Sequence, residues 1–172
     1  MKTLFKISIT IVAILFATHE VFSQEELSGK LDSMMNSSNP VTVLAGNHLN
    51  NLVYSPGATL YYKNGLIKVG NDTAYRLTVN ANSFDSLPST NSLYNNVELL
   101  CIKLDDPSDL NYLYNFSFLS SFANLKYVHF LCSFKLCPGS GVSVCESGKI
   151  SALVQGSFSS AIQILYTSET IH

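Results

Sequence analysis

Two apolar runs of similar pattern, 28 residues apart, limit what this chain of 172 residues can fold into. The first reads NVELLCIKL from residue 96, and the second reads NLKYVHFLC from residue 124. Each begins with Asn, an aliphatic residue and a charge, and continues with mostly apolar residues. Such runs are typical of strands in a parallel sheet that is covered on both faces. Because parallel strands need a crossover connection, the sequence predicts a strand, a helix and a second strand.

The segment between the two runs has features of a helix. It opens with DDPSD at residues 105–109, where Pro suits the first turn and acidic groups complement the positive end of the helix dipole. Leu110, Leu113 and Tyr114 then follow the spacing of one helical face. The rule for parallel crossovers makes this connection right-handed.

Weaker copies of the strand pattern flank the pair. Residues 74–79 alternate between polar and apolar side chains, and residues 161–166 form a final apolar run. Between the second run and the last, residues 146–155 fit a helix with a stripe of Ile150, Leu153 and Val154, ended by Gly156. We therefore expect an α/β fold with a short right-handed stack of β-α units. Its parallel strands are expected near residues 75–79, 99–104, 127–132 and 161–166.

The N-terminal half is predicted to add a β-hairpin. Residues 58–62 and 66–69 flank Lys63, Asn64 and Gly65, and Asn-Gly between such runs favours a type I′ turn. The short β-branched run VTVL at residues 41–44 is interpreted as a further strand.

Three segments follow from these patterns. Residues 1–23 combine two lysines, an apolar run and small or aliphatic residues before position 24, the order of a secretory signal peptide. The apolar run is too short for a membrane span, which needs about 20 residues, so no stable membrane insertion is expected after cleavage. The polar residues 24–40 are expected to be a flexible leader, and residues 41–172 a single globular α/β domain, secreted or periplasmic.

The residues 119–130, LSSFANLKYVHF, resemble a leucine-rich repeat, in which spaced apolar residues precede an Asn-Leu pair and a short strand. Asn96-Val97-Glu98-Leu99-Leu100-Cys101-Ile102 matches the same frame, and the interval of 28 residues lies in the range of that family. The resemblance implies a stack of parallel strands with a recognition face. The alternative is an α/β or α+β domain with one strand-helix-strand unit and a β-rich N-terminal part.

Charge excludes two classes of partner. The formal net charge is −2, and it becomes −3 without Lys2, Lys6 and Glu20 of the predicted signal peptide. The remaining basic residues are scattered, whereas nucleic acids and anionic membranes need a clustered basic surface. We therefore expect neither partner.

The four cysteines allow one disulfide prediction. Cys137 and Cys145 bracket a Gly- and Pro-rich loop, and export permits them to form a bridge. Cys101 and Cys132 lie inside the apolar runs, where a free cysteine behaves as a small hydrophobe. The spacing lacks the closely paired ligands of a zinc site, so no metal or cofactor is predicted.

No catalytic residues are predicted either. His48, His129 and His172 are the histidines after the signal segment, and no neighbour in sequence identifies a partner for any of them. The segment 139–141 (GSG) lacks the pattern of a nucleophile elbow or phosphate loop, and the acidic residues 105–109 lack that of a calcium loop.

Three functional hypotheses remain, and the third, which the sequence does not separate from the first, is a structural or envelope-associated domain with no specific ligand. The first is an exported non-enzymatic module that binds another protein or a cell-surface component through its strand face, with residues such as Tyr75, Tyr112 and Tyr127 near the strands. The second is a small exported hydrolase or carbohydrate-active enzyme. A pocket that holds His48 within hydrogen-bond reach of a carboxylate or a thiol would favour this second hypothesis.

Overall fold

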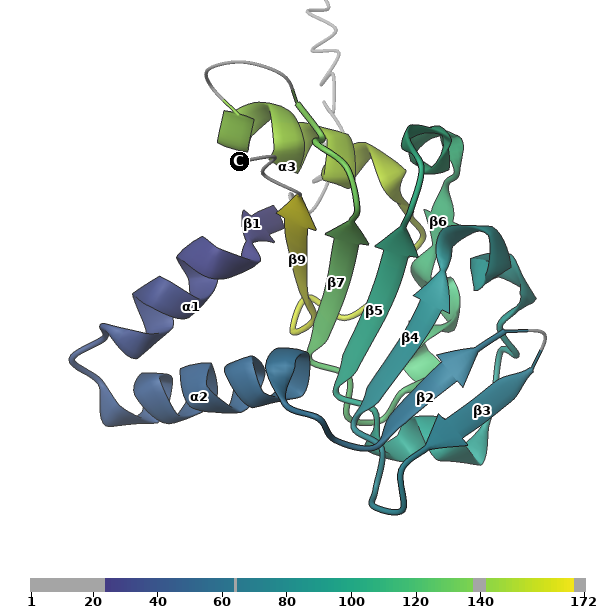
Figure 1. The fold of residues 1–172 in the computed structure, drawn as a ribbon, viewed down its shortest axis with the longest axis horizontal. Helices are drawn as coiled ribbons and strands as arrows, with labels where there is room; N and C mark the ends of the chain where they lie inside the picture. The colour runs from purple at the N-terminus through teal and green to yellow at the C-terminus, as the bar shows by residue number, and fades with distance from the viewer. Residues whose placement is uncertain (1–23, 64, 138–141, 169–172) are drawn as a thin grey trace, which may run out of the picture.

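A seven-stranded sheet forms the centre of the computed structural model, which describes residues 24–63, 65–137 and 142–168 (Figure 1). The strand order is β1-β9-β7-β5-β4-β2-β3, and every neighbouring pair is parallel except β2 and β3. The strands are β1 (Gln24–Glu26), β2 (Thr59–Tyr62), β3 (Leu66–Val69), β4 (Arg76–Asn80), β5 (Leu99–Leu104), β7 (Tyr127–Cys132) and β9 (Gln163–Ser168). A separate pair of short parallel strands consists of β6 (Tyr114–Asn115) and β8 (Val154–Gln155).

The mixed α/β class and the four expected parallel strands are confirmed. The strands β4, β5, β7 and β9 are successive neighbours, and Leu100 of β5 lies opposite Val128 of β7. The hairpin is confirmed as the antiparallel pair β2 and β3. The disulfide between Cys137 and Cys145 is also present. The predicted signal peptide, residues 1–23, lies outside the described residues.

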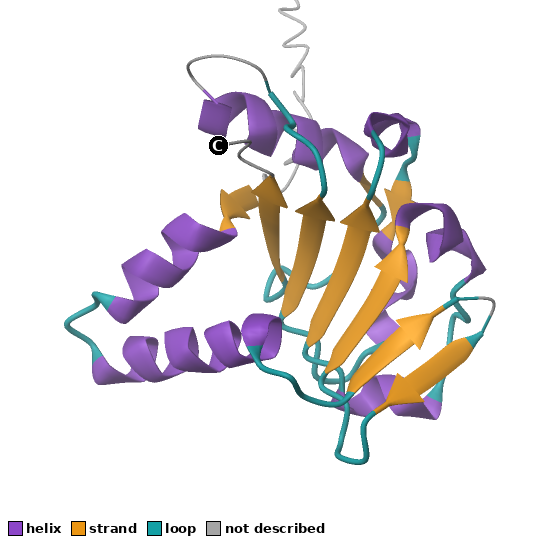
Figure 2. Cartoon of the chain, viewed as in Figure 1, coloured by secondary structure: helices purple, strands orange, loops and turns teal. Residues whose placement is uncertain are grey.

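One face of the sheet builds the main core. Leu77, Leu100, Ile102, Val128 and Phe130 are each fully buried on this face. The connections between strands cover it, as Figure 2 shows. They are four 3-10 helices and one α-helix: η1 (Ala81–Ser86), η2 (Ser92–Asn96), η3 (Pro107–Asn111), η4 (Phe116–Ser121) and α3 (Val142–Leu153).

The predicted helix between β5 and β7 is wrong, because η3, β6 and η4 occupy that interval. Both η3 and η4 begin at a residue whose side chain caps the helix. Asp106 accepts a hydrogen bond from the Ser108 amide, and Asn115 accepts one from the Ser117 amide. Asp and Asn side chains that bond nearby backbone groups favour short turns over a continuous helix. The interval is therefore divided into short turns.

Two N-terminal helices correct two further predictions. The residues expected as a flexible leader contain β1 and the helix α1 (Leu27–Met35), and residues 41–44 lie in the helix α2 (Pro40–Tyr54) rather than in a strand. Asn39 caps α2 through the Val41 amide, and Pro40 occupies the first helical position, which outweighs the β propensity of the run that follows.

The same helices pack on the second face of the sheet. Leu27, Leu31, Leu49 and Leu52 form a smaller core with the strand residues Leu99, Tyr127 and Leu165. Gly46 lets α1 and α2 approach closely, since a Cβ there would lie 2.9 Å from the Cβ of Met34. In the described part of the chain, no helix is both long and apolar enough to cross a bilayer.

Candidate functional site

The second face of the sheet is only partly covered. Figure 1 shows α1 and α2 on the β9 side of the molecule, away from β2 and β3. Alternate strand residues share a face. Arg76 and Thr78 of β4 therefore point the same way as Cys101 and Lys103 of β5 and His129 of β7. These side chains lie beyond the small N-terminal core and form the floor and walls of a cavity.

This strand-face cavity has a volume of about 440 Å³. Among the described residues that line it, none is Asp or Glu. Its lining consists of Leu27, Val53, Tyr54, Tyr61, Arg76, Thr78, Leu99, Cys101, Lys103, His129, Leu131 and Thr167. It thus combines a mostly apolar wall with two basic side chains, Arg76 and Lys103.

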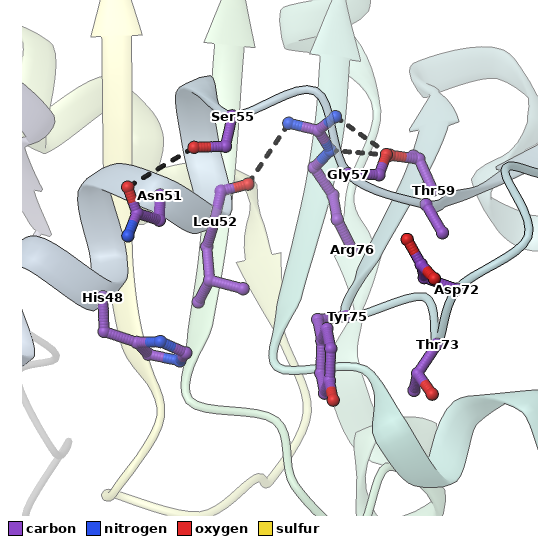
Figure 3. Close-up of a pocket in the computed structure, with 11 residues that line it drawn as sticks. His48, Asn51, Leu52, Ser55, Gly57, Thr59, Asp72, Thr73, Tyr75 and Arg76 are labelled. Atoms are coloured by element: carbon purple, nitrogen blue, oxygen red, sulfur yellow. Dashed lines mark hydrogen bonds between the residues drawn. The ribbon is translucent and has the colours of Figure 1, made fainter.

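Arg76 is the only arginine of the chain, and it joins α2 to the sheet. Its Nη1 donates to the carbonyl oxygens of Leu52 (3.2 Å) and Val53 (2.7 Å) at the end of α2. Its Nε and Nη2 donate to Oγ1 of Thr59 at 3.2 and 2.9 Å (Figure 3). All of these acceptors are uncharged, and no ion pair within the described residues involves Arg76. The exposed Asp72 lines a neighbouring cavity together with Arg76, but it forms no ion pair with the guanidinium.

His129 and Cys101 lie side by side on the cavity floor but do not form a catalytic pair. They face each other across the β5–β7 ladder. The imidazole Nε2 lies 2.9 Å from Oγ1 of Thr167, and burial lowers the pKa of His129 to about 4. Burial raises the pKa of Cys101 to about 11, although the charges of Arg76 and Lys103 oppose that shift. A neutral thiol beside a neutral imidazole is a poor nucleophile.

His48 lines a second cavity, of about 270 Å³, near the end of α2 (Figure 3). Its Nε2 lies 2.8 Å from Oε2 of Glu98, and Nζ of Lys126 lies 2.6 Å from the same oxygen. Burial alone would raise the pKa of Glu98, but the hydrogen bonds and charges of Lys126 and His48 lower it below its usual value. A carboxylate therefore lies within hydrogen-bond reach of His48, a contact that would favour the enzyme hypothesis, although Glu98 does not line the cavity itself. No Ser, Thr or Cys of the described residues hydrogen-bonds to His48.

The remaining sequence candidates have structural roles or lie elsewhere. Oδ2 of Asp109 accepts hydrogen bonds from the amides of Asp105 and Asp106, which fixes the start of η3. The described residues contain no cluster of His, Cys, Asp and Glu suited to a metal ion. Tyr127 is buried in the small core, whereas Tyr75 and Tyr112 are exposed. His172 and the segment 139–141 lie outside the described residues.

An exposed apolar patch adjoins the strand-face cavity. It consists of Tyr54, Tyr61, Ile67 and Val69, whose exposed fractions are 64%, 41%, 52% and 55%. Tyr61, Ile67 and Val69 lie on one face of the β2–β3 hairpin and line a third cavity of about 340 Å³. Strand β3 is the last of the sheet, and its outer edge has no neighbouring strand among the described residues.

Sequence reasoning missed Arg76, Lys103 and this patch. The signal available was strand alternation, which places a single cation in each of β4 and β5 on the face opposite the main core. This alternation would have indicated a cationic site only if the second face of the sheet had been known to be partly uncovered.

Comparisons with protein-family models, with curated proteins and with solved structures gave no significant match to this chain.

Proposed function

We propose that this protein is an exported, non-enzymatic module that binds another protein through the open part of its strand face. The observation that carries the proposal is the contiguous patch of Tyr54, Tyr61, Ile67 and Val69 beside a free sheet edge. Clustered exposed apolar residues mark interaction surfaces more often than scattered ones do. An unpaired edge offers backbone donors and acceptors to an incoming strand.

The charges around the patch favour an acidic partner. Lys63 and Lys103 line the third cavity, which has no acidic lining residue among those described, and Arg76 lies in the adjoining cavity. A partner segment with alternating apolar and acidic residues would match both the patch and its cationic surroundings.

The strand arrangement supports the resemblance to leucine-rich repeats. Parallel strands begin at residues 76, 99, 127 and 163, and 3-10 helices cover the face opposite the proposed binding surface. We include in the proposal that these units form a short repeat stack, with α1 and α2 covering part of its strand face. Export is supported by the sequence pattern of residues 1–23 and by the Cys137–Cys145 disulfide, since disulfides persist in oxidising compartments.

A double substitution that introduces two negative charges into the patch tests the protein-binding proposal. Tagged protein is used to recover partners from the medium of the producing cells, with wild type compared to the double variant Ile67→Glu and Val69→Glu. Carboxylates at these positions replace apolar contacts and repel an acidic segment, so we expect a partner bound by wild type to be lost.

The matched control carries Leu93→Glu and Val144→Glu, two exposed apolar positions outside the patch. This control should retain the partner. Recovery of the same partner by the Ile67/Val69 variant, or of no specific partner by wild type, would contradict the proposal.

A hydrolase remains the second candidate because the His48–Glu98 hydrogen bond of 2.8 Å orients an imidazole beside a cavity. A carboxylate that orients a histidine is the support a general base uses. Turnover of ester or glycoside substrates that disappears in His48→Gln would establish it. The absence of turnover by wild type would leave the binding function as the better account.

A further inference from the structure

We propose that the strand-face cavity binds a small amphipathic organic anion, an apolar body that carries one carboxylate or sulfonate. This inference concerns a small-molecule site and does not depend on the protein partner proposed above. It follows from the size of the cavity, the character of its walls and the placement of its charges.

The size and walls fit the body of such a ligand. The volume of about 440 Å³ lies within the range of about 300–1,000 Å³ that is usual for small-molecule sites. Leu27 and Val53 from the N-terminal helices and Leu99 and Leu131 from the sheet all line this space. Tyr54 and Tyr61 add two aromatic rings at the side that leads to the exposed patch. The cavity is therefore mostly apolar, with a few polar groups that can orient a ligand.

The charged side chains of the cavity favour a ligand with a negatively charged head group. Arg76 and Lys103 both line the cavity, while the described lining residues include no Asp or Glu. The chain as a whole carries a formal charge of −2, so this local excess of positive charge runs against the overall balance. An anion that enters the cavity would therefore be attracted by the two basic side chains. No described carboxylate of the lining would repel it or become buried beneath it.

Arg76 has no ion-pair partner among the described residues, and Lys103 has one exposed partner, Asp105. Arg76 makes hydrogen bonds only to neutral oxygens. Lys103 approaches Asp105 at 3.5 Å, but both side chains are more than a third exposed, and such ion pairs contribute little. The Lys103 ammonium is therefore free to exchange this contact for a less exposed anion.

The cavity floor supplies a built-in reporter of occupancy. Cys101 is a free thiol that lines the cavity and retains 7% exposure. Cys132, the other free thiol, points into the main core on the opposite face, with 2% exposure. A ligand in the cavity shields Cys101 directly, whereas Cys132 is affected only through the stability of the fold, so the reaction of Cys101 should slow more than that of Cys132.

Matched probes test the charge requirement by titration calorimetry. Naphthalene-2-carboxylate and its neutral amide share one apolar body and differ in charge, so we expect the carboxylate to bind roughly tenfold more tightly. The variant Lys103→Gln should weaken the carboxylate by roughly fivefold to tenfold and leave the amide unchanged. Lys68→Gln is the control, since Lys68 lies opposite Leu60 on the other face of the hairpin and does not line the cavity.

Peptide mapping after N-ethylmaleimide treatment of the unmutated protein locates the bound probe. Saturating carboxylate should slow modification of Cys101 several-fold more than modification of Cys132, which responds only to the added stability of the folded state. Equal affinity for carboxylate and amide, an equal effect of both lysine variants, no protection of Cys101, or no binding heat from the carboxylate would each overturn the proposal.

These results are separable from those for the protein partner. The Ile67 and Val69 side chains do not line the strand-face cavity, so the double glutamate variant should still bind the carboxylate. Loss of the partner by the double glutamate variant, with retained carboxylate binding, is the result that both proposals predict.

Discussion

Replacing Arg76 by Met should destabilise the fold by more than any other single loss of a surface charge in the described chain. The guanidinium makes four hydrogen bonds, two to carbonyls at the end of α2 and two to Thr59. Leu52 and Val53 belong to the last turn of α2, where carbonyls have no partner within the helix. Thr59 is 2% exposed, so its hydroxyl would lose its charged donors inside the protein.

The expected magnitude follows from these groups. Hydrogen bonds to a charged group contribute about 1.5–3 kcal/mol each in favourable cases, but Arg76 is only partly buried and its bonds share two local sites. Allowing for solvent and for non-additivity, we expect a loss of about 2–4 kcal/mol in the free energy of unfolding. Met retains the apolar stem, so the loss reports the guanidinium rather than the packing.

Urea unfolding followed by circular dichroism measures this loss. With an m-value of about 2 kcal/mol/M, the midpoint should fall by about 1–2 M. Arg76→Lys should recover only part of the loss, because an ammonium cannot bridge the helix end and Thr59 with the planar fork of a guanidinium. Lys68→Met, at an exposed cation, should stay within about 0.5 kcal/mol of wild type. A midpoint for Arg76→Met that equals that of Lys68→Met would refute the reasoning.

Two further predictions concern the N-terminal helices and the cavity floor. Gly46→Ala should cost about 1–3 kcal/mol in urea unfolding, since its Cβ would lie 2.9 Å from that of Met34, whereas Gly148→Ala in α3 has no atom within 4 Å and should be neutral or stabilising. A Gly46→Ala variant as stable as Gly148→Ala would contradict the close helix contact. For His129, burial lowers the folded-state pKa from 6.5 to about 4, so the unfolded chain binds the proton more readily. The neutral His129 side chain leaves the free energy of unfolding undiminished above about pH 6.5. As the pH falls toward 4, protonation of the unfolded chain lowers that free energy by about 3 kcal/mol. His129→Gln should flatten this part of the pH–stability curve, and an unchanged slope would show that another group controls it.

The strands of the sheet could be predicted because burial on both faces leaves a strong mark on the sequence. Residues 99–104 and 127–132 are nearly continuous apolar runs, and the structure places them side by side and parallel. The Cys137–Cys145 bridge and the hairpin around Gly65 could also be predicted, because each depends on residues that are close in sequence. Gly65 has a φ of 139°, which a side chain other than Gly rarely adopts.

The N-terminal helices could not be predicted from local pattern because their stability comes from tertiary contacts. Leu27 and Leu31 are isolated apolar residues in a polar stretch, yet they are 1% and 7% exposed against the sheet. The site was missed for the same reason. Whether Arg76 and Lys103 face solvent or a cavity depends on the presence of α2, and residues 41–44 suggested a strand in place of its first turn.

The position of α2 connects stability to binding in this fold. Leu49 and Leu52 of α2 close the small core, the next residues Val53 and Tyr54 form a wall of the strand-face cavity, and Arg76 holds the helix end in place. A change that loosens the end of α2 therefore opens the cavity and weakens the core at once. A ligand that occupies the cavity contacts the same helix end, so its binding free energy would add to the stability of the folded state, by about 2.7 kcal/mol at a free concentration of about 100 Kd. A ligand in the cavity would therefore strengthen the hold of α1 and α2 on the sheet, whereas Ile67 and Val69 of the patch line a cavity to which neither helix contributes a described residue.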